Sequence, residues 1–228
     1  MRQITVVEDP GAAVAERLTA AAEQGAHIVL TGGSTPRGAY TIAAEQDADW
    51  SDATVWFSDE RCVPPDHPDS NFAMAQRALL SRLTKPPRVM RMEGELGPVA
   101  GAASYEALVR EHLGATPRWD LMLLGLGPDA HTASLFPNRP EKDVTDRLVV
   151  GVPEAGLEPF VPRISFTLPL IDAAREIVFL VSGAGKAQAV ARAFGGPPDP
   201  ATPASLVAPA SGSLTVLLDP AAAELLRT

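Results

Sequence analysis

The chain has 228 residues, of which 46% are hydrophobic and 21% are charged, and its formal net charge is −9. This size and composition suit one well-packed globular domain, and we expect residues 1–228 to form it. The negative charge argues against nucleic acid as the main partner, because binding a phosphate backbone requires a basic face. The single cysteine, Cys62, excludes a disulfide framework and a four-thiolate zinc site.

No stretch approaches the roughly 18 apolar residues of a membrane-spanning helix. The residues before Pro10 contain no apolar run typical of a secretory signal. We therefore expect a cytoplasmic protein without a membrane partner. The negative charge still permits a small phosphate ligand, which needs only a few local donors.

Short apolar runs alternate with helix-like stretches along the chain. Strands are predicted at 4–7, 28–30, 55–57, 88–92, 121–124, 177–181 and 214–218, and helices at 12–23, 37–45, 71–83 and 100–113, with another ending at 194 and a last one at the C-terminus. This alternation predicts a mostly parallel, doubly wound, Rossmann-like α/β sheet with flanking helices. The Pro/Gly-rich stretches 151–162 and 195–203 are expected to be surface loops. Ligands bind at the carboxyl ends of such strands, where four Gly-rich or charged segments are expected to meet.

The first of these segments is Thr31-Gly32-Gly33-Ser34-Thr35-Pro36. Thr35 is the expected N-cap of the next helix, and Pro36 suits the first helical position. Free N–H groups at such a helix start would bind an anion, although the segment could equally be a tight strand-to-helix turn. It lacks the lysine of a phosphate-binding P-loop and the GxGxxG pattern, which disfavours a nucleotide.

The second segment is Asp59-Glu60-Arg61, at the end of the third predicted strand. Two carboxylates beside an arginine suit acid–base chemistry or phosphate binding, because the guanidinium fork matches phosphate. More often, however, three consecutive charged residues of this kind form a salt-bridged loop. Cys62 is expected to be a packing residue rather than a nucleophile, since no neighbour would lower its pKa.

The third segment, 125–134, reads Gly-Leu-Gly-Pro-Asp-Ala-His-Thr-Ala-Ser. His131 could act as a general base near neutral pH, and Asp129 could orient it. A solvated histidine without a role is the alternative. His27, His67 and His112 lie in contexts that suggest no chemistry.

The fourth segment, 182–186, ends in Lys186 near the start of a helix. A cation there opposes the helix dipole at a cost of about 0.3–1 kcal/mol, which a bound phosphate would reverse. Lys186 could also be an exposed lysine that tolerates this cost. Arg163, in Pro-Arg-Ile-Ser, is uninformative when it is taken alone.

Taken together, the segments are recognisable. GGSTP, SDERCVPPDHPDSNF, LGLGPDAHTASLFP, RISFTLPLI and GAGKAQAV occur in this order. They resemble the 6-phosphogluconolactonase family of the pentose phosphate pathway, over about residues 25–220. The third motif is the most specific of the five.

The resemblance implies an α/β catalytic domain related to the amino-sugar-phosphate isomerases, with no cofactor and no metal. It also implies hydrolysis of 6-phospho-D-glucono-1,5-lactone to 6-phospho-D-gluconate. By matching motif, His131 would activate water and Asp129 would set its environment. The implied substrate-binding residues are Gly32, Gly33, Ser34, Thr35, Asp59, Arg61, Ser70, Asn71, Arg163 and Lys186. The oligomeric state is left open as a monomer or a small homo-oligomer.

One position departs from the family pattern, which commonly has glycine where this chain has Ala130. If the backbone there needs a positive φ, alanine would be strained by about 1 kcal/mol, and we expect altered loop detail rather than lost activity.

Two other functions remain open. An amino-sugar-phosphate deaminase would usually carry tyrosine at the position of Arg61 and a glutamate shortly after the histidine, whereas 132–137 has no carboxylate. A non-catalytic phosphosugar sensor would typically carry a DNA-binding module, for which the predicted first strand at Ile4 leaves no room.

Overall fold

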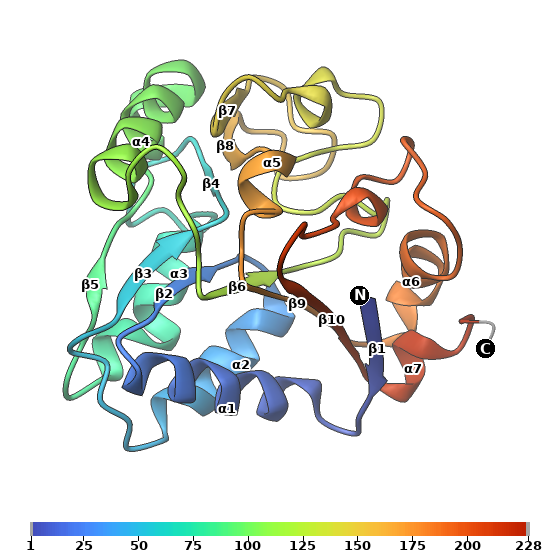
Figure 1. The fold of residues 1–228 in the computed structure, drawn as a ribbon, viewed down its shortest axis with the longest axis horizontal. Coiled ribbons are helices and arrows are strands. Elements are labelled where there is room, and N and C mark those ends of the chain that lie inside the picture. Colours follow the sequence, from blue (N-terminus) through green and yellow to red (C-terminus); the bar gives the residue numbers. More distant parts are fainter. Residues whose placement is uncertain (1, 227–228) are drawn as a thin grey trace.

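The computed structural model describes residues 2–226, and a parallel sheet runs through its centre (Figure 1). Its seven strands follow the order β1-β10-β9-β6-β2-β3-β5, and every neighbouring pair is parallel. The bounds are β1 Arg2–Val6, β2 His27–Leu30, β3 Thr54–Phe57, β5 Arg88–Val89, β6 Leu121–Leu124, β9 Glu176–Val181 and β10 Ser213–Leu218. The predicted parallel α/β sheet is therefore confirmed.

Helices cover both faces of this sheet. They are α1 Pro10–Glu23, α2 Ser34–Ala44, α3 Asn71–Ala78, α4 Gly97–Leu113, α5 Leu168–Ile171, α6 Ala187–Phe194 and α7 Pro220–Ala223. Figure 1 shows α1 and α2 together below the sheet and α4 above it. Central strands such as β6 are buried at every position, as expected when helices cover both faces. Strand order reverses between β2 and β6, and that is where an open α/β sheet forms its ligand crevice.

Three tryptophans form part of the core. Trp50, Trp56 and Trp119 are all fully buried, and the last two meet edge to face with ring centroids 5.1 Å apart. Trp119 also stacks on Phe166, which comes from outside the parallel sheet. The core therefore ties the main sheet to a second layer above it.

That second layer is a three-stranded antiparallel sheet that sequence analysis missed. It consists of β4 Asp59–Arg61, β8 Arg163–Phe166 and β7 Val149–Val152, with β8 in the middle. The prediction of a loop over 151–162 is wrong at its start, because Gly151 and Val152 belong to β7. The expectation that Asp59-Glu60-Arg61 is a loop is also wrong. These strands have only three or four residues, and every residue of β4 is charged. They are too short to show the alternation of apolar and polar residues by which a strand is recognised.

Helix boundaries also differ from expectation. Helix α2 begins at Ser34 and has Gly33 as its N-cap, so Thr35 is not the cap and Pro36 is not the first helical residue. The φ of Gly33 is +112°, a conformation that favours glycine and lets the chain turn directly from the loop into the helix. Helix α3 ends at Ala78 rather than near 83.

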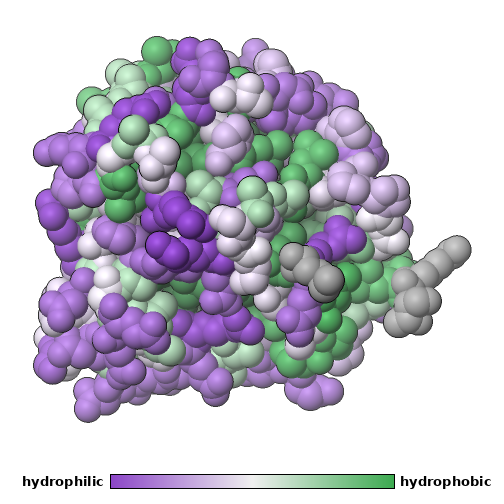
Figure 2. Space-filling view, in the orientation of Figure 1, coloured by the Kyte–Doolittle hydropathy of each residue, from purple (hydrophilic) through white to green (hydrophobic). Residues whose placement is uncertain are grey.

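The edge of the main sheet at β1 carries exposed apolar side chains. Ile4 is 38% and Val6 is 50% exposed, and Figure 2 shows hydrophobic atoms gathered around this strand. None of the helices within residues 2–226 has the length and apolar character to cross a membrane.

Candidate active site

A pocket of about 170 Å³ lies where four strand ends of the main sheet meet the second sheet. Its lining comes from the turn after β2, from β4, from the loop after β6, from the 157–158 loop, from β8 and from the segment before α6. The predicted residues that line it are Gly32, Gly33, Asp59, Arg61, His131, Arg163 and Lys186. The expected convergence of strand-end segments is therefore found in the structure.

His131 lines this pocket, and Asp129, which is not among the lining residues, holds it through a hydrogen bond. The imidazole Nδ1 lies 2.5 Å from Asp129 Oδ1, which also accepts the backbone N–H of His131 at 3.1 Å. Burial alone would raise the pKa of Asp129, but the hydrogen bond and positive charge from His131 outweigh it and lower that pKa. An ionised carboxylate thus fixes the proton on Nδ1, leaving Nε2 as the nitrogen that can accept one.

The backbone of the 125–132 loop is shaped to bring this pair together. The Ala130 N–H donates to Gly127 O, and the Gly127 N–H donates to His131 O, both at 2.9 Å. A Cβ on Gly127 would lie 2.1 Å from His131 Nδ1, so only glycine fits. Ala130 adopts φ +68°, which confirms that this position demands positive φ.

One wall of the pocket carries two arginines. Arg61 on β4 and Arg163 on β8 are direct partners in the antiparallel register. Arg61 Nη1 donates to Asp69 O at 2.6 Å, and Arg163 Nη2 donates to the carbonyls of Leu157 and Pro159 at 3.0 and 2.9 Å. Within residues 2–226, both Nε atoms are buried without a hydrogen-bond partner. Because both side chains line the pocket, their guanidiniums are placed to meet an anion there.

Charge and burial act together at these arginines. Burial, followed by the charge of Arg61, lowers the pKa of Arg163, although a guanidinium stays protonated at neutral pH. Like charges that face each other across strands destabilise the pair. An anion placed between them would remove that repulsion, so the wall is suited to a phosphate or carboxylate.

Lys186 also lines the pocket. Its Nζ donates to Leu126 O at 2.7 Å, so the lysine also anchors the histidine loop. Burial lowers the pKa of Lys186, and the charge of Asp129 opposes this shift. A lysine so placed can share its remaining N–H donors with a ligand.

Asp59 lines the pocket but is held by hydroxyl groups rather than by a cation. It is 4% exposed, and its carboxylate accepts hydrogen bonds from Ser134 Oγ at 2.7 Å and Ser58 Oγ at 3.0 Å. The backbone N–H of Ser134 in turn donates to Ser165 Oγ at 3.1 Å. Sequence reasoning missed Ser134 and Ser165, although Ser134 lies only three residues beyond His131 in the same motif.

Ser70 and Asn71 do not line the pocket but support it from behind. The buried carboxylate of Glu60 accepts Ser70 Oγ and the N–H groups of Arg61, Asn71 and Phe72 at 2.7–2.9 Å. Asn71 Nδ2 donates to Asp59 O at 2.9 Å, and a Cβ on Gly32 would lie 2.1 Å from Asn71 Oδ1. Glu60 thereby joins the start of α3 to β4 and leaves its two neighbours facing the pocket.

The remaining predicted residues lie elsewhere. Ser34 and Thr35 line a separate hollow with Asp9 and Ser182 beside α1. Leu157 and Glu158 line the pocket although no motif indicated them.

Burial and the charge of Glu60 raise the pKa of Cys62 to about 11, which disfavours a thiolate nucleophile. Within residues 2–226, no group of three or more His, Cys, Asp or Glu side chains could hold a metal ion.

A parallel α/β sheet, a histidine–carboxylate pair and an arginine wall define a phosphosugar-binding enzyme class, and comparisons with known proteins agree. The family described as glucosamine-6-phosphate isomerases/6-phosphogluconolactonase matches residues 3–216. A 6-phosphogluconolactonase of Nostoc sp. is 40% identical, with 97% of each chain covered. The chain therefore belongs to this family.

Solved structures extend the agreement to three dimensions. The crystal structure of the devB protein has a TM-score of 0.91 at 32% identity, with 100% of both chains covered. A 6-phosphogluconolactonase from Trypanosoma cruzi has a TM-score of 0.87 at 25% identity, covering 100% of this chain and 98% of that one. The second, antiparallel sheet is thus part of an arrangement shared over the whole chain.

Proposed function

We propose that this chain hydrolyses 6-phospho-D-glucono-1,5-lactone to 6-phospho-D-gluconate, the lactonase step of the oxidative pentose phosphate pathway. The proposal rests chiefly on one observation: His131, held by Asp129, lines the same pocket as two cross-strand arginines. Its close relatives named 6-phosphogluconolactonase support the same reaction.

The substrate phosphate binds at Arg61 and Arg163, with Lys186 as a third cation. Their charges and free N–H donors compensate the phosphate charge, and each charge-assisted hydrogen bond contributes about 1.5–3 kcal/mol. Gly32 and Gly33 let the backbone approach the sugar closely. This anchoring places the lactone carbonyl beside His131.

His131 acts as the general base. Its Nε2 removes a proton from water while the water oxygen attacks the lactone carbonyl carbon, and Asp129 stabilises the resulting imidazolium. The tetrahedral intermediate then expels the ring oxygen, which takes the proton from His131. The bond between the carbonyl carbon and the ring oxygen breaks, and the product is an open-chain acid. General-base assistance contributes roughly 10²–10⁴-fold.

The deaminase alternative has less support. This family includes glucosamine-6-phosphate isomerases, but Arg61 replaces the tyrosine expected of them, and segment 132–137 offers no carboxylate to pair with His131. A non-catalytic sensor would have no use for a histidine held by a carboxylate.

We further propose that the enzyme acts in the cytoplasm without cofactor or metal. It would be a monomer or a small homo-oligomer.

The test compares two freshly prepared substrates, 6-phosphoglucono-δ-lactone and unphosphorylated gluconolactone, each against its spontaneous hydrolysis. Fast turnover of the phosphorylated lactone alone supports both the reaction and the anion wall. Equal turnover of both lactones would contradict the proposed binding of the substrate phosphate by the cationic side chains. No acceleration of either would refute the lactonase assignment.

A further inference from the structure

The loop that carries Asp129 and His131 is held from outside by a single stretch of chain. The carbonyls of Leu126, Pro128 and Ala130 point out of the loop. Each accepts a hydrogen bond: from Lys186 Nζ at 2.7 Å, from Arg192 Nη2 at 2.7 Å and from the Ala204 N–H at 3.1 Å. All three donors belong to segment 186–204, which contains α6 and the turn that follows it.

Two of these contacts flank the reacting pair directly. Pro128 immediately precedes Asp129, and Ala130 lies between Asp129 and His131. Ala130 is fully buried at φ +68°, a conformation that costs a non-glycine residue on the order of 1 kcal/mol or more. Such strain persists only where the surroundings over-determine the backbone, and segment 186–204 provides that constraint.

We propose that Arg192 is a positioning residue for the hydrolysis. Through Pro128 O, together with the Ala204 N–H at Ala130 O, it fixes the turn that places the Asp129 carboxylate on His131 Nδ1. Arg192 does not line the pocket, so it acts on the histidine and not on the substrate. This inference rests on the proposed role of His131 as the base.

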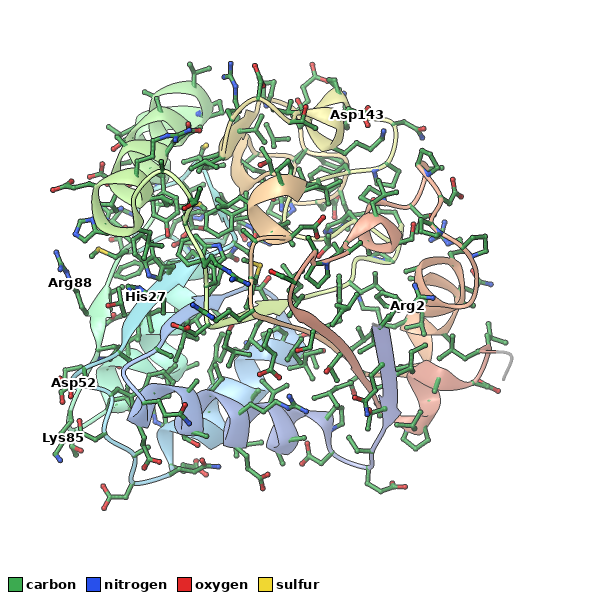
Figure 3. The ribbon with its side chains drawn as sticks, viewed as in Figure 1. Arg2, His27, Asp52, Lys85, Arg88 and Asp143 are labelled. Carbon is green, nitrogen blue, oxygen red and sulfur yellow. The ribbon has the colours of Figure 1, made fainter. Side chains whose placement is uncertain are left out.

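A purely structural role for Arg192 is the competing explanation. It lies in the last turn of α6, where a cation interacts favourably with the helix dipole. Arg2 offers a matched control for that role, because its guanidinium donates to Phe194 O at 3.0 Å and Gly196 O at 3.3 Å, at the end of the same helix. Figure 3 labels Arg2 beside β1 and α6. Arg2 therefore stabilises α6 without touching the histidine loop.

The experiment compares the wild type with Arg192→Ala, Arg192→Lys and Arg2→Ala. For Arg192→Ala we expect kcat to fall about tenfold with KM within twofold, since displacing a catalytic group by 1 Å can cost about 100-fold. Arg192→Lys should recover most of kcat, because one N–H donor suffices for Pro128 O. Arg2→Ala should lower the melting temperature but leave kcat unchanged.

A spectroscopic readout separates this proposal from the proposed function. The Nδ1–H proton that His131 shares with Asp129 should give a downfield NMR resonance, which His131→Ala removes. Arg192→Ala should broaden or shift it, and Arg2→Ala should not. An unchanged resonance and unchanged kcat in Arg192→Ala would overturn the positioning role, whatever His131→Ala does to turnover. Equal losses of kcat in Arg192→Ala and Arg2→Ala would also overturn it, because helix stability would then explain both.

Discussion

Arg61 and Arg163 are direct cross-strand partners, and both guanidiniums have a buried Nε without a hydrogen-bond partner within residues 2–226. Two like charges thus line a pocket that His131 also lines. Such a pair is unfavourable unless other charges compensate it. Asp59, Asp69 and Glu60 compensate Arg163 in part, and an anion bound in the pocket would add to this compensation.

Replacing Arg61 with glutamine should therefore weaken binding of the phosphorylated substrate. We expect KM for 6-phosphoglucono-δ-lactone to rise about 10- to 100-fold, the equivalent of one charge-assisted hydrogen bond of about 1.5–3 kcal/mol. The slow background turnover of unphosphorylated gluconolactone should not change. Arg110→Gln, which removes an exposed arginine on α4, is the control. A uniform loss on both lactones would show that Arg61 acts on folding rather than on phosphate.

Gly127→Ala should nearly abolish turnover while leaving phosphate binding intact. The added Cβ would lie 2.1 Å from His131 Nδ1 and 2.7 Å from Asp129 Oδ1, so the imidazole must move away from its carboxylate. Steady-state kinetics and titration with 6-phosphogluconate together measure the two effects. Gly38→Ala on α2, where a Cβ meets nothing within 4 Å, should retain full activity and gain about 0.5–1 kcal/mol of stability.

Glu60→Gln should lower the free energy of unfolding by about 1–3 kcal/mol. The carboxylate accepts three hydrogen bonds from the start of α3 and one from the Arg61 N–H of β4. The amide of glutamine would point its own N–H groups at some of these donors. Chemical denaturation measures the loss. Glu154→Gln, at an exposed site that is paired only with Arg139, should stay within about 0.5 kcal/mol of the wild type. A Glu60 variant as stable as this control would contradict the supporting role.

His27 should make stability depend on pH. Burial lowers its pKa, with Asp120 opposing and His112 reinforcing the shift, and its Nδ1 accepts the Trp56 indole N–H at 3.1 Å. Figure 3 shows His27 and Arg88 at the side of the main sheet near β3 and β5. The unfolded chain thus takes up a proton more readily than the folded one, so this contribution is complete above pH 6.5 and is lost as the pH falls through the lowered folded value.

The measurement is the unfolding free energy at pH 7.5 and 5.5 for the wild type and for His27→Gln. The wild type should lose more stability than the variant over this interval. His67→Gln, at an exposed histidine beside Asp69, is the matched substitution for comparison. Identical slopes for the wild type and the His27 variant would show that other groups carry the acid sensitivity.

The parallel sheet was predictable because its strands are apolar runs separated by helix-length segments. The antiparallel sheet was not, because β4 consists of Asp59, Glu60 and Arg61, whose polarity is set by the pocket and by the start of α3. The charged residues of β4 are there because of the site, so their polarity does not indicate the secondary structure.

The same limit applies to the site. Strand-end motifs predicted seven of the pocket residues, since carboxyl ends of parallel strands meet at one edge of the sheet. The motifs could not distinguish residues that line the pocket from residues that hold the lining residues in place. Ser70 and Asn71 were therefore expected to bind the substrate, although they bond to Glu60 and Asp59. The contact between Arg192 and Pro128 spans 64 positions in the chain, and no motif encodes it.

The most direct test of the account is single-turnover hydrolysis of fresh 6-phosphoglucono-δ-lactone by the wild type and by His131→Ala. We predict that the variant loses at least about 100-fold in rate, the lower limit of general-base assistance, and binds 6-phosphogluconate as tightly as the wild type. A variant that binds normally and turns over at the wild-type rate would contradict His131 as the base.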